Sequence, residues 1–254
     1  MTELVLLEGR GSIRHLVLNR PHARNAFNWE LLHALAERLR MVGDDPAVRC
    51  VVIRGAGPVF SAGIDLSILP QLASAPHTLL PFRRAWTAIG ALIEQMPKPV
   101  IAQIHGAVLG GAFELILACD MRVVTDTTTM RFMETLNGVV PDAGGCARLP
   151  GIVGVGRAKE LILASRPITG ERAAQIGLAN HAVPSADLDS TVQALVDDLL
   201  ACKPVAVAMA KRVIDQAARP NLAAALDQEL MAQEVCFATE DFRRLADQLT
   251  ESQS

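Results

Sequence analysis

The sequence has no tyrosine, and only 4% of its 254 residues are aromatic. A tyrosine acid, tyrosine base or tyrosine stacking platform is therefore excluded. The 24 basic and 27 acidic residues give a net charge of −3, so the overall field of the protein recruits neither nucleic acid nor an anionic membrane. There is no long charge run and no polar low-complexity segment, which argues against disorder. A chain of this length can bury a full hydrophobic core.

Cysteines are few, widely spaced and odd in number, and none forms a CxxC pair; they are Cys50, Cys119, Cys146, Cys202 and Cys236. This usage favours neither a disulfide framework nor a zinc knuckle. The first eleven residues contain Glu3 and Glu8 and do not resemble a signal peptide. The most apolar stretch, residues 99–119, is interrupted by polar side chains and does not resemble a membrane span. We therefore expect a cytoplasmic protein.

Several common site motifs are missing. The six histidines never occur as HxH or HxxxH, so no metal site is predicted. Gly154 and Gly156 begin a GxG, but Lys159 stands where a dinucleotide fingerprint needs its third glycine. No GxSxG elbow is present, which removes the commonest signal of a serine hydrolase.

Hydrophobic periodicity predicts an α/β fold with an all-helical C-terminal part. The expected strands are 4–7, 13–19, 50–53, 100–104, 122–125, 129–132 and 176–183. The expected helices are one capped by Asn28, then 84–96, 111–119, 157–164, 188–201, 205–218, 222–238 and 240–249. We therefore divide the chain into a core, residues 1–187, and a helical region, residues 188–254. A helical tail on such a core often packs on a partner subunit.

Three carboxylates occur in apolar or glycine-rich surroundings. Glu114 lies in the first turn of a very hydrophobic helix. Glu134 follows a strand, and alternation would place it on the same face as Met130, Phe132 and Leu136, where a charge is costly. Asp142 stands between a proline and two glycines. Each has a structural alternative, namely a favourable helix dipole for Glu114, an arginine partner for Glu134 and a helix cap for Asp142.

Two glycine-rich turns, residues 60–66 and 105–111, each follow a buried strand. Glycine lets a ligand approach the main chain closely. Two backbone N–H groups converging there, one of them at a helix N-terminus, could hold a developing oxyanion. Either turn alone is equally well explained as a tight turn.

The order of short motifs along residues 18–184 resembles the enoyl-CoA hydratase/isomerase (crotonase) superfamily. The matching motifs are LNRP (18–21), NAFN (25–28), FSAGIDL (60–66), KPVIA (98–102), GAVLGG (106–111), CDMR (119–122) and GVVPDAGG (138–145). The combination is highly specific, because seven motifs follow in the family's order.

The resemblance implies a spiral of ββα turns whose C-terminal helices build trimers, often paired into hexamers. It also implies an acyl-CoA thioester substrate, whose carbonyl is held by the backbone amides of Ile64 and Gly111. Glu114 and Glu134 match the two glutamates of the hydratases, and Asp142 matches the catalytic aspartate of dienoyl-CoA isomerases. The same motifs imply substrate or coenzyme A contacts at Arg24, Ala26, Ala62, Gly63, Asp65, Leu66, Gly110 and Pro141.

The sequence also departs from the family pattern. Ser67 replaces a lysine that many members place near the coenzyme A phosphates, and Ala112 and Phe113 replace the commoner Gly-Cys pair. The end of the chain after Asp241 lacks the family's usual motif, so we expect the last helix to close the pocket differently. We expect residues 68–86 to line the acyl part of that pocket.

Hydration of a trans-2-enoyl thioester needs water activated at C3 and a proton delivered to C2. Two carboxylates in an apolar pocket raise each other's pKa, so one can act as acid and the other as base. The resemblance therefore favours a hydratase with no metal or redox cofactor, coenzyme A being part of the substrate.

Isomerisation through Asp142 remains an alternative. Non-catalytic RNA binding is known from one relative of the family. The sequence does not support it here, because it has no basic stripe and few aromatic residues. A peptidase function, suggested by the related spiral fold of Clp-type proteases, is not supported either, because these motifs contain no serine–histidine arrangement.

Overall fold

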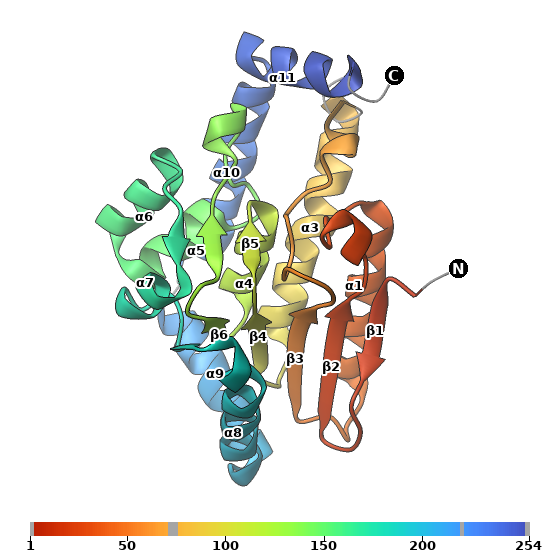
Figure 1. Cartoon of the computed structure of the whole chain (residues 1–254), viewed down its shortest axis with the longest axis vertical. Coiled ribbons are helices and arrows are strands. Elements are labelled where there is room, and N and C mark those ends of the chain that lie inside the picture. Colours follow the sequence, from red (N-terminus) through yellow and green to blue (C-terminus); the bar gives the residue numbers. More distant parts are fainter. Residues whose placement is uncertain (1–2, 71–75, 219–220, 252–254) are drawn as a thin grey trace.

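A mostly parallel sheet forms the centre of the molecule (Figure 1) in the computed structural model, which describes residues 3–70, 76–218 and 221–251. Its spatial order is β1 (Val5–Glu8), β2 (Ile13–Leu18), β3 (Cys50–Gly55), β4 (Val100–Ile104), β6 (Met121–Thr125) and β9 (His181–Val183). Strands β1 and β2 are antiparallel, and every later neighbour pair is parallel. The central strands are mainly apolar because helices cover both of their faces.

Alternate residues of the central strands face two different helical layers. Val51, Ile53 and Ala102 pack with α1 (Trp29–Asp44), α3 (Pro76–Gln95) and α4 (Gly111–Ala118). Their neighbours in sequence, such as Val52 and Ile101, pack instead against α8 (Leu188–Ala201). The two-residue period of a strand thus divides one apolar run between two cores.

A second, three-stranded sheet lies beside the first and gives the fold its repeat. It contains β5 (Ala107–Leu109), β7 (Thr129–Arg131) and β8 (Ile168–Thr169). The chain passes from β4 to β5 and then into α4. It next passes from β6 to β7 and then into α5 (Gly145–Val153) and α6 (Val155–Leu163). These are turns of a ββα spiral, so the expected architecture is confirmed.

Helix α1 shows how the sequence specifies local structure. The side chain of Asn28 accepts a hydrogen bond from the Leu31 amide at 3.0 Å and so caps the helix, as predicted. Leu32, Leu35 and Leu39 recur at intervals of three and four and are buried. The remaining elements are short: η1 (Pro21–Ala23), η2 (Leu66–Ile68), η3 (Thr135–Asn137), α7 (Gly170–Gln175) and η4 (Ser185–Asp187).

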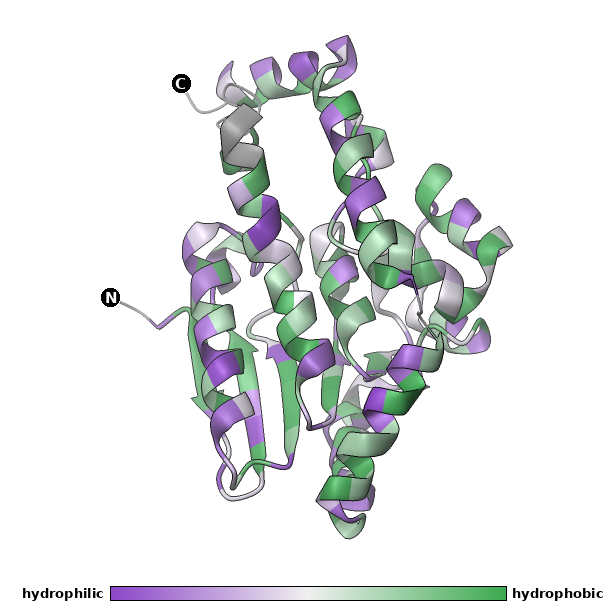
Figure 2. Cartoon of the chain, turned by 180° about the vertical axis from the view of Figure 1, so that it is seen from behind, coloured by the Kyte–Doolittle hydropathy of each residue, from purple (hydrophilic) through white to green (hydrophobic). Residues whose placement is uncertain are grey.

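The C-terminal helices extend from both ends of the core (Figure 1). Helices α10 (Leu222–Phe237) and α11 (Glu240–Glu251) lie at the top of the view, where α11 contacts η2 and η3. Helix α9 (Pro204–Ala218) lies at the other end beside α8 and has no buried side chain among those described. Figure 2 shows many hydrophobic residues along these lower helices. Within the described ranges, no helix has the length and apolar content needed to cross a membrane.

Two element predictions were wrong. The segment 176–183 is not one strand, because α7 ends at Gln175, Gly177 has a φ of +78°, and only His181–Val183 pairs with β6. The helix expected at 84–96 begins earlier, at Pro76, and contains Pro81 in its first turns. Helix α5 was not predicted, because its glycines and Pro150 disguise the pattern. Residues 71–75 of the expected acyl-pocket segment lie outside the described residues.

Candidate active site

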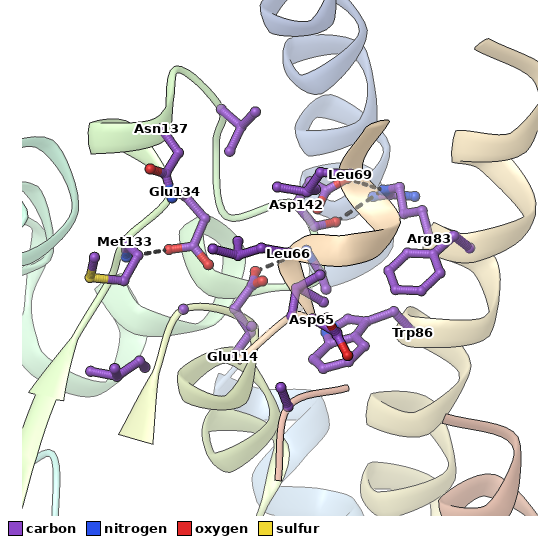
Figure 3. A pocket seen from close by; sticks show the side chains of 18 of the residues that line it. Asp65, Leu66, Leu69, Arg83, Trp86, Glu114, Met133, Glu134, Asn137 and Asp142 are labelled. Atoms are coloured by element: carbon purple, nitrogen blue, oxygen red, sulfur yellow. Dashed lines mark hydrogen bonds and ion pairs between the residues drawn. The ribbon is translucent and has the colours of Figure 1, made fainter. Parts of the chain in front are cut away.

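A cavity of about 390 Å³ lies between α3, α4, α10 and the loops that follow β3, β5 and β7 (Figure 3). This volume falls within the range of about 300–1,000 Å³ that is usual for small-molecule sites. Its wall is mainly apolar, with a few carboxyl groups and one guanidinium among the residues described. The residues that line it include Ala26, Ala62, Ile64, Asp65, Leu66, Leu69, Phe82, Arg83, Trp86, Gly110, Gly111, Glu114, Glu134, Val140, Asp142, Gln233 and Phe237.

The two glycine-rich turns lie side by side at this cavity. Ser61 and Val108 form a parallel bridge, in which the Leu109 amide donates to the Ser61 carbonyl at 3.1 Å. Ile64 pairs with Phe27 in a second parallel bridge. The Phe27 amide donates to the Gly63 carbonyl, and the Asp65 amide donates to the Phe27 carbonyl. The N–H of Ile64 therefore points away from Phe27, because successive strand residues direct their amides to opposite sides.

Within the part of the chain that the structure describes, neither the Ile64 N–H nor the Gly111 N–H has a hydrogen-bond acceptor. Gly111 is the first residue of α4, where N–H groups have no partner within the helix. Both residues line the cavity. Two backbone donors without an acceptor, one of them at a helix N-terminus, thus border the same cavity, which is what an oxyanion site would require.

Two glycines make this close approach possible. Gly63 has a φ of +91°, and a Cβ built on it would lie 2.5 Å from the Leu109 carbonyl oxygen and 3.4 Å from the Gly111 nitrogen. Gly110 has a φ of +50°, and a Cβ there would meet a carboxyl oxygen of Glu134 at 3.0 Å. Side chains at either position would separate the two turns or displace Glu134.

Glu114 is held at the base of the cavity by the main chain. It lies in the first turn of α4, whose other residues are all buried. Its Oε1 accepts hydrogen bonds from the amides of Ala143 and Gly145, both at 2.9 Å. A favourable interaction with the helix dipole is therefore not the whole role of Glu114, because its carboxyl also binds a loop distant in sequence and faces the cavity.

Glu134 does not lie on the strand face predicted for it. Strand β7 ends at Arg131, and Glu134 has helical backbone angles at the start of η3. Met130 and Phe132 are fully buried, whereas Leu136 is 57% exposed, so the alternation does not continue. Oε2 of Glu134 accepts a hydrogen bond from the Met133 amide at 2.8 Å, and the carboxyl faces the cavity (Figure 3). No arginine partner for it is found among the described residues.

Asp142 is not a helix cap, because the N-cap of α5 is Gly144. Its carboxyl instead faces Arg83 of α3, with Nε of Arg83 at 3.6 Å from Oδ2 (Figure 3). That Nε donates to the main-chain oxygen of Asp142 at 2.9 Å. Oδ2 is buried and has no hydrogen-bond partner within the described residues. Leaving a buried polar group without a hydrogen bond costs roughly 1–3 kcal/mol, and more when the group is charged.

Burial sets the protonation of all three carboxyls. It raises the pKa of Glu134 to about 7, and the charge of Asp142 adds to this rise. It also raises the pKa of Asp142 to about 7, although Arg83 opposes the rise. The pKa of Glu114 is raised well above its usual value by burial and by Glu134, Asp142 and Glu229. A cluster of this kind can hold one carboxyl protonated while another is ionised near neutral pH.

The other predicted contact residues fall into two groups. Ala26, Ala62, Asp65, Leu66 and Gly110 line the cavity, and Gly63 supports its wall. The structure does not bring Arg24 or Pro141 into the cavity lining: Arg24 is exposed and Pro141 is buried against Gly145. Asp65 pairs with Arg20 at 2.5 Å; burial alone would raise its pKa, but hydrogen bonds from Ser67 and Arg20 lower it.

Three polar residues at the site were not predicted from the sequence. Arg83 and Gln233 line the cavity, and Glu229 lies just behind its wall. Arg83 stands in a segment that was expected to line the acyl pocket, but no motif singled it out. Glu229 and Gln233 are four residues apart in α10, and this polar spacing among leucines was the available signal.

Comparisons with known proteins identify a family. The family model described as enoyl-CoA hydratase/isomerase matches residues 8–253. A crotonyl-CoA hydratase of Syntrophomonas wolfei is 34% identical over 244 residues, covering 94% of this chain and 92% of that protein. An enoyl-CoA isomerase/hydratase of Mycosarcoma maydis is also 34% identical, over 92% of this chain and 88% of that protein.

Solved structures show the same fold. The crystal structure of an enoyl-CoA hydratase/isomerase from Mycobacterium paratuberculosis superposes with a TM-score of 0.90 at 29% identity, covering 98% of this chain and 99% of that one. The motif order, the ββα spiral and these matches lead to one assignment. The chain belongs to the enoyl-CoA hydratase/isomerase, or crotonase, superfamily.

Proposed function

We propose that this protein is an enoyl-CoA hydratase, which adds water across the C2–C3 double bond of a trans-2-enoyl-CoA thioester. The observation that carries the proposal is the meeting of Glu114 and Glu134 in one cavity with the unpaired amides of Ile64 and Gly111. The family is enzymatic, and the relative from Syntrophomonas wolfei bears the name of a hydratase.

The thioester carbonyl oxygen would accept hydrogen bonds from the Ile64 and Gly111 N–H groups. These donors are fixed by the fold and need no rearrangement when negative charge develops on the oxygen. The positive end of α4 adds to the stabilisation. The acyl chain would then extend along Leu66, Leu69 and Trp86, which line the cavity.

The two glutamates would carry the proton transfers. As the oxygen of water bonds to C3, an ionised carboxyl of the pair takes one proton of that water. The electrons of the double bond move to C2 and the thioester oxygen, and a protonated carboxyl then delivers its proton to C2. Burial raises the pKa of both glutamates, which favours a pair that shares one proton near neutral pH, as this reaction requires.

We assign supporting roles to the other residues that the family resemblance implies as substrate contacts. Ala26, Ala62, Gly63, Asp65, Leu66 and Gly110 would shape the passage for the thioester. Arg24 is exposed next to Ala23, which lines the cavity, so its guanidinium is available to coenzyme A phosphates outside. Pro141 would act by shaping the loop before Asp142. The proposed reaction needs no cofactor beyond the coenzyme A of the substrate.

Isomerisation is a second candidate, favoured by one observation. Asp142 places a third buried carboxyl, with a pKa of about 7, on the cavity wall. A carboxyl at this position could move a proton between carbons farther along the acyl chain than C3.

The test is to incubate the purified protein, without added metal or nucleotide, with 2-enoyl-, 3-enoyl- and dienoyl-CoA thioesters of several chain lengths. Hydration adds the mass of one water, whereas isomerisation leaves the mass unchanged, so mass spectrometry after chromatography separates the two. We expect a 3-hydroxyacyl-CoA from at least one 2-enoyl-CoA. No hydrated product at any chain length, from protein shown to be folded, would remove the hydratase assignment.

A further inference from the structure

Helix α10 packs on the active-site loop through polar groups. Its buried side chains are those of Glu229 and Gln233. Gln233 accepts a hydrogen bond from the Val140 amide at 2.9 Å, and Arg83 donates to the main-chain oxygen of Leu226. Residues 226, 229 and 233 are three and four positions apart, so they share one face of the helix. This face therefore follows the loop from Val140 into α5.

Glu229 binds the first turn of α5 with both of its carboxyl oxygens. Oε1 accepts from the Ala147 amide at 2.6 Å, and Oε2 accepts from the Gly144 amide at 2.8 Å. These N–H groups have no partner within α5, because they belong to its N-terminal end. The side chain is 5% exposed, so water cannot readily replace these contacts.

The amides on either side of Gly144 bind the other glutamate. Ala143 and Gly145 donate to Oε1 of Glu114. The segment 143–147 is thus held by two glutamates from different helices. Glu114 of α4 binds the amides of Ala143 and Gly145, and Glu229 of α10 binds those of Gly144 and Ala147. A shift of this segment that lengthened the bonds to Glu229 would also move the donors that orient Glu114.

We propose that Glu229 is a positioning residue of the active site, which fixes the Ala143 and Gly145 amides and through them the carboxyl of Glu114. Glu229 does not line the cavity, so it would act through the loop rather than on the substrate. The inference rests on the proposed function, since Glu114 is taken as one of the groups that transfer protons.

Among the described residues, no neighbouring charge offers Glu229 another partner of comparable geometry. The guanidinium of Arg148 is bound to Glu94, at 2.8 and 2.9 Å, and to the Ala143 main-chain oxygen. Asp142 lies on the same loop and, when ionised, disfavours a charge on Glu229, whereas Arg148 favours one. The amides of α5 are therefore the groups that hold the Glu229 carboxyl in place.

Replacing Glu229 by Gln tests this because it keeps the size of the side chain but removes one acceptor. A glutamine has one carbonyl oxygen, and its NH₂ group would meet a backbone N–H as donor against donor. The matched control is Glu234→Gln, which makes the same change at an exposed position of the same helix. Glu229→Asp keeps the charge and shortens the side chain by one methylene, and it serves if Glu229→Gln does not fold.

Three measurements separate positioning from a general structural role. The first is kcat and KM for the enoyl-CoA that the wild type converts best. The second is the Kd for butanoyl-CoA, a saturated thioester that cannot be hydrated. The third is amide hydrogen exchange at residues 143–147, followed by NMR. For Glu229→Gln we expect kcat to fall on the order of tenfold to a hundredfold, as small misplacements of catalytic groups do.

Binding should survive, because the Ile64 and Gly111 amides do not contact α10. We therefore expect unchanged KM and Kd, faster exchange at Ala143 and Gly145, and wild-type values for Glu234→Gln. Unchanged kcat in Glu229→Gln, or loss of butanoyl-CoA binding in parallel with kcat, overturns the proposal. If the wild type converts no thioester, the proposed function fails. Exchange at Ala143 and Gly145 then still decides the positioning role, unchanged rates counting against it.

Discussion

A single carboxyl oxygen of Glu114 accepts the hydrogen bond of Gly145 at 2.9 Å, and the same oxygen also accepts the amide of Ala143. The second oxygen of Glu114 is therefore not needed to hold the loop. A glutamine at this position can keep both contacts with its carbonyl oxygen, while it loses the ability to donate or accept a proton in the reaction. Glu134 likewise uses one oxygen, Oε2, to bind the Met133 amide.

We accordingly predict that Glu114→Gln and Glu134→Gln each lower kcat by roughly a hundredfold to ten-thousandfold, the usual contribution of a general acid or base. Both variants should remain folded and bind butanoyl-CoA. Steady-state kinetics and calorimetric titration check the two halves of this prediction. Glu171→Gln, at an exposed position of α7, is the control. Near-normal turnover in either variant would return that glutamate to a structural role.

The pKa of Glu134 sets an expectation for the pH profile. Burial raises this pKa to about 7, with a further contribution from Asp142. Hydration needs one ionised carboxyl to accept a proton from water, and protonation of the pair removes it. We predict that kcat/KM falls as the pH is lowered through about 7, and that Glu134→Gln loses this limb. A profile that is flat from pH 8 to pH 5.5 would contradict the assignment.

The amino-acid sequence was sufficient for the fold and for part of the site. The seven motifs predicted the ββα spiral, and α4 begins at Gly111 with Glu114 in its first turn, as expected. The predicted strand face of Glu134 was wrong, because the two-residue alternation of a strand was extended beyond Arg131, where the strand ends. A strand terminus depends on pairing partners far away in sequence, which local alternation does not contain.

The polar contacts of α10 could not be predicted for a related reason. Helical periodicity is read from apolar residues such as Leu222, Leu226 and Leu230, which are only half-buried here, and it carries no information on the partners of polar side chains. The side chains that α10 buries are Glu229 and Gln233, whose partners lie 82 to 93 residues earlier. A buried glutamate and an exposed one look alike in a single sequence until the fold places their partners.

The exposed apolar residues of α9 lead to a prediction about assembly. Val205, Met209, Val213 and Ile214 are 51–74% exposed, and α9 buries none of its described side chains. Exposed apolar patches of this kind usually mark an interface. We predict a homotrimer or a dimer of trimers that buries this helix, measured by light scattering coupled to size exclusion.

Ile214→Glu should shift that assembly toward monomer, because a charge would be buried at the interface. Glu37→Lys, a change at an exposed position on α1, should leave the mass unchanged. A wild-type protein that is monomeric at working concentration would contradict the prediction.

Asp142 distinguishes hydration from isomerisation. Its Oδ2 is buried without a hydrogen-bond partner among the described residues, 3.6 Å from Nε of Arg83, and burial raises its pKa to about 7. Arg83 is held independently by the main-chain oxygens of Asp142 and Leu226, so it should stay in place when the carboxyl is changed. Asp142→Asn keeps the shape of the side chain and removes its charge and its proton chemistry.

We predict that Asp142→Asn leaves hydration of short 2-enoyl-CoA substrates largely intact, because Glu114 and Glu134 serve C2 and C3. Any isomerisation of 3-enoyl- or dienoyl-CoA by the wild type should fall by on the order of a hundredfold or more, since that reaction would lose its general acid–base group. Comparing both reactions in the same preparation makes each the control for the other. If the wild type isomerises faster than it hydrates, isomerisation is the main reaction. Equal losses of both activities would instead assign Asp142, with Arg83, to holding the loop that orients Glu114.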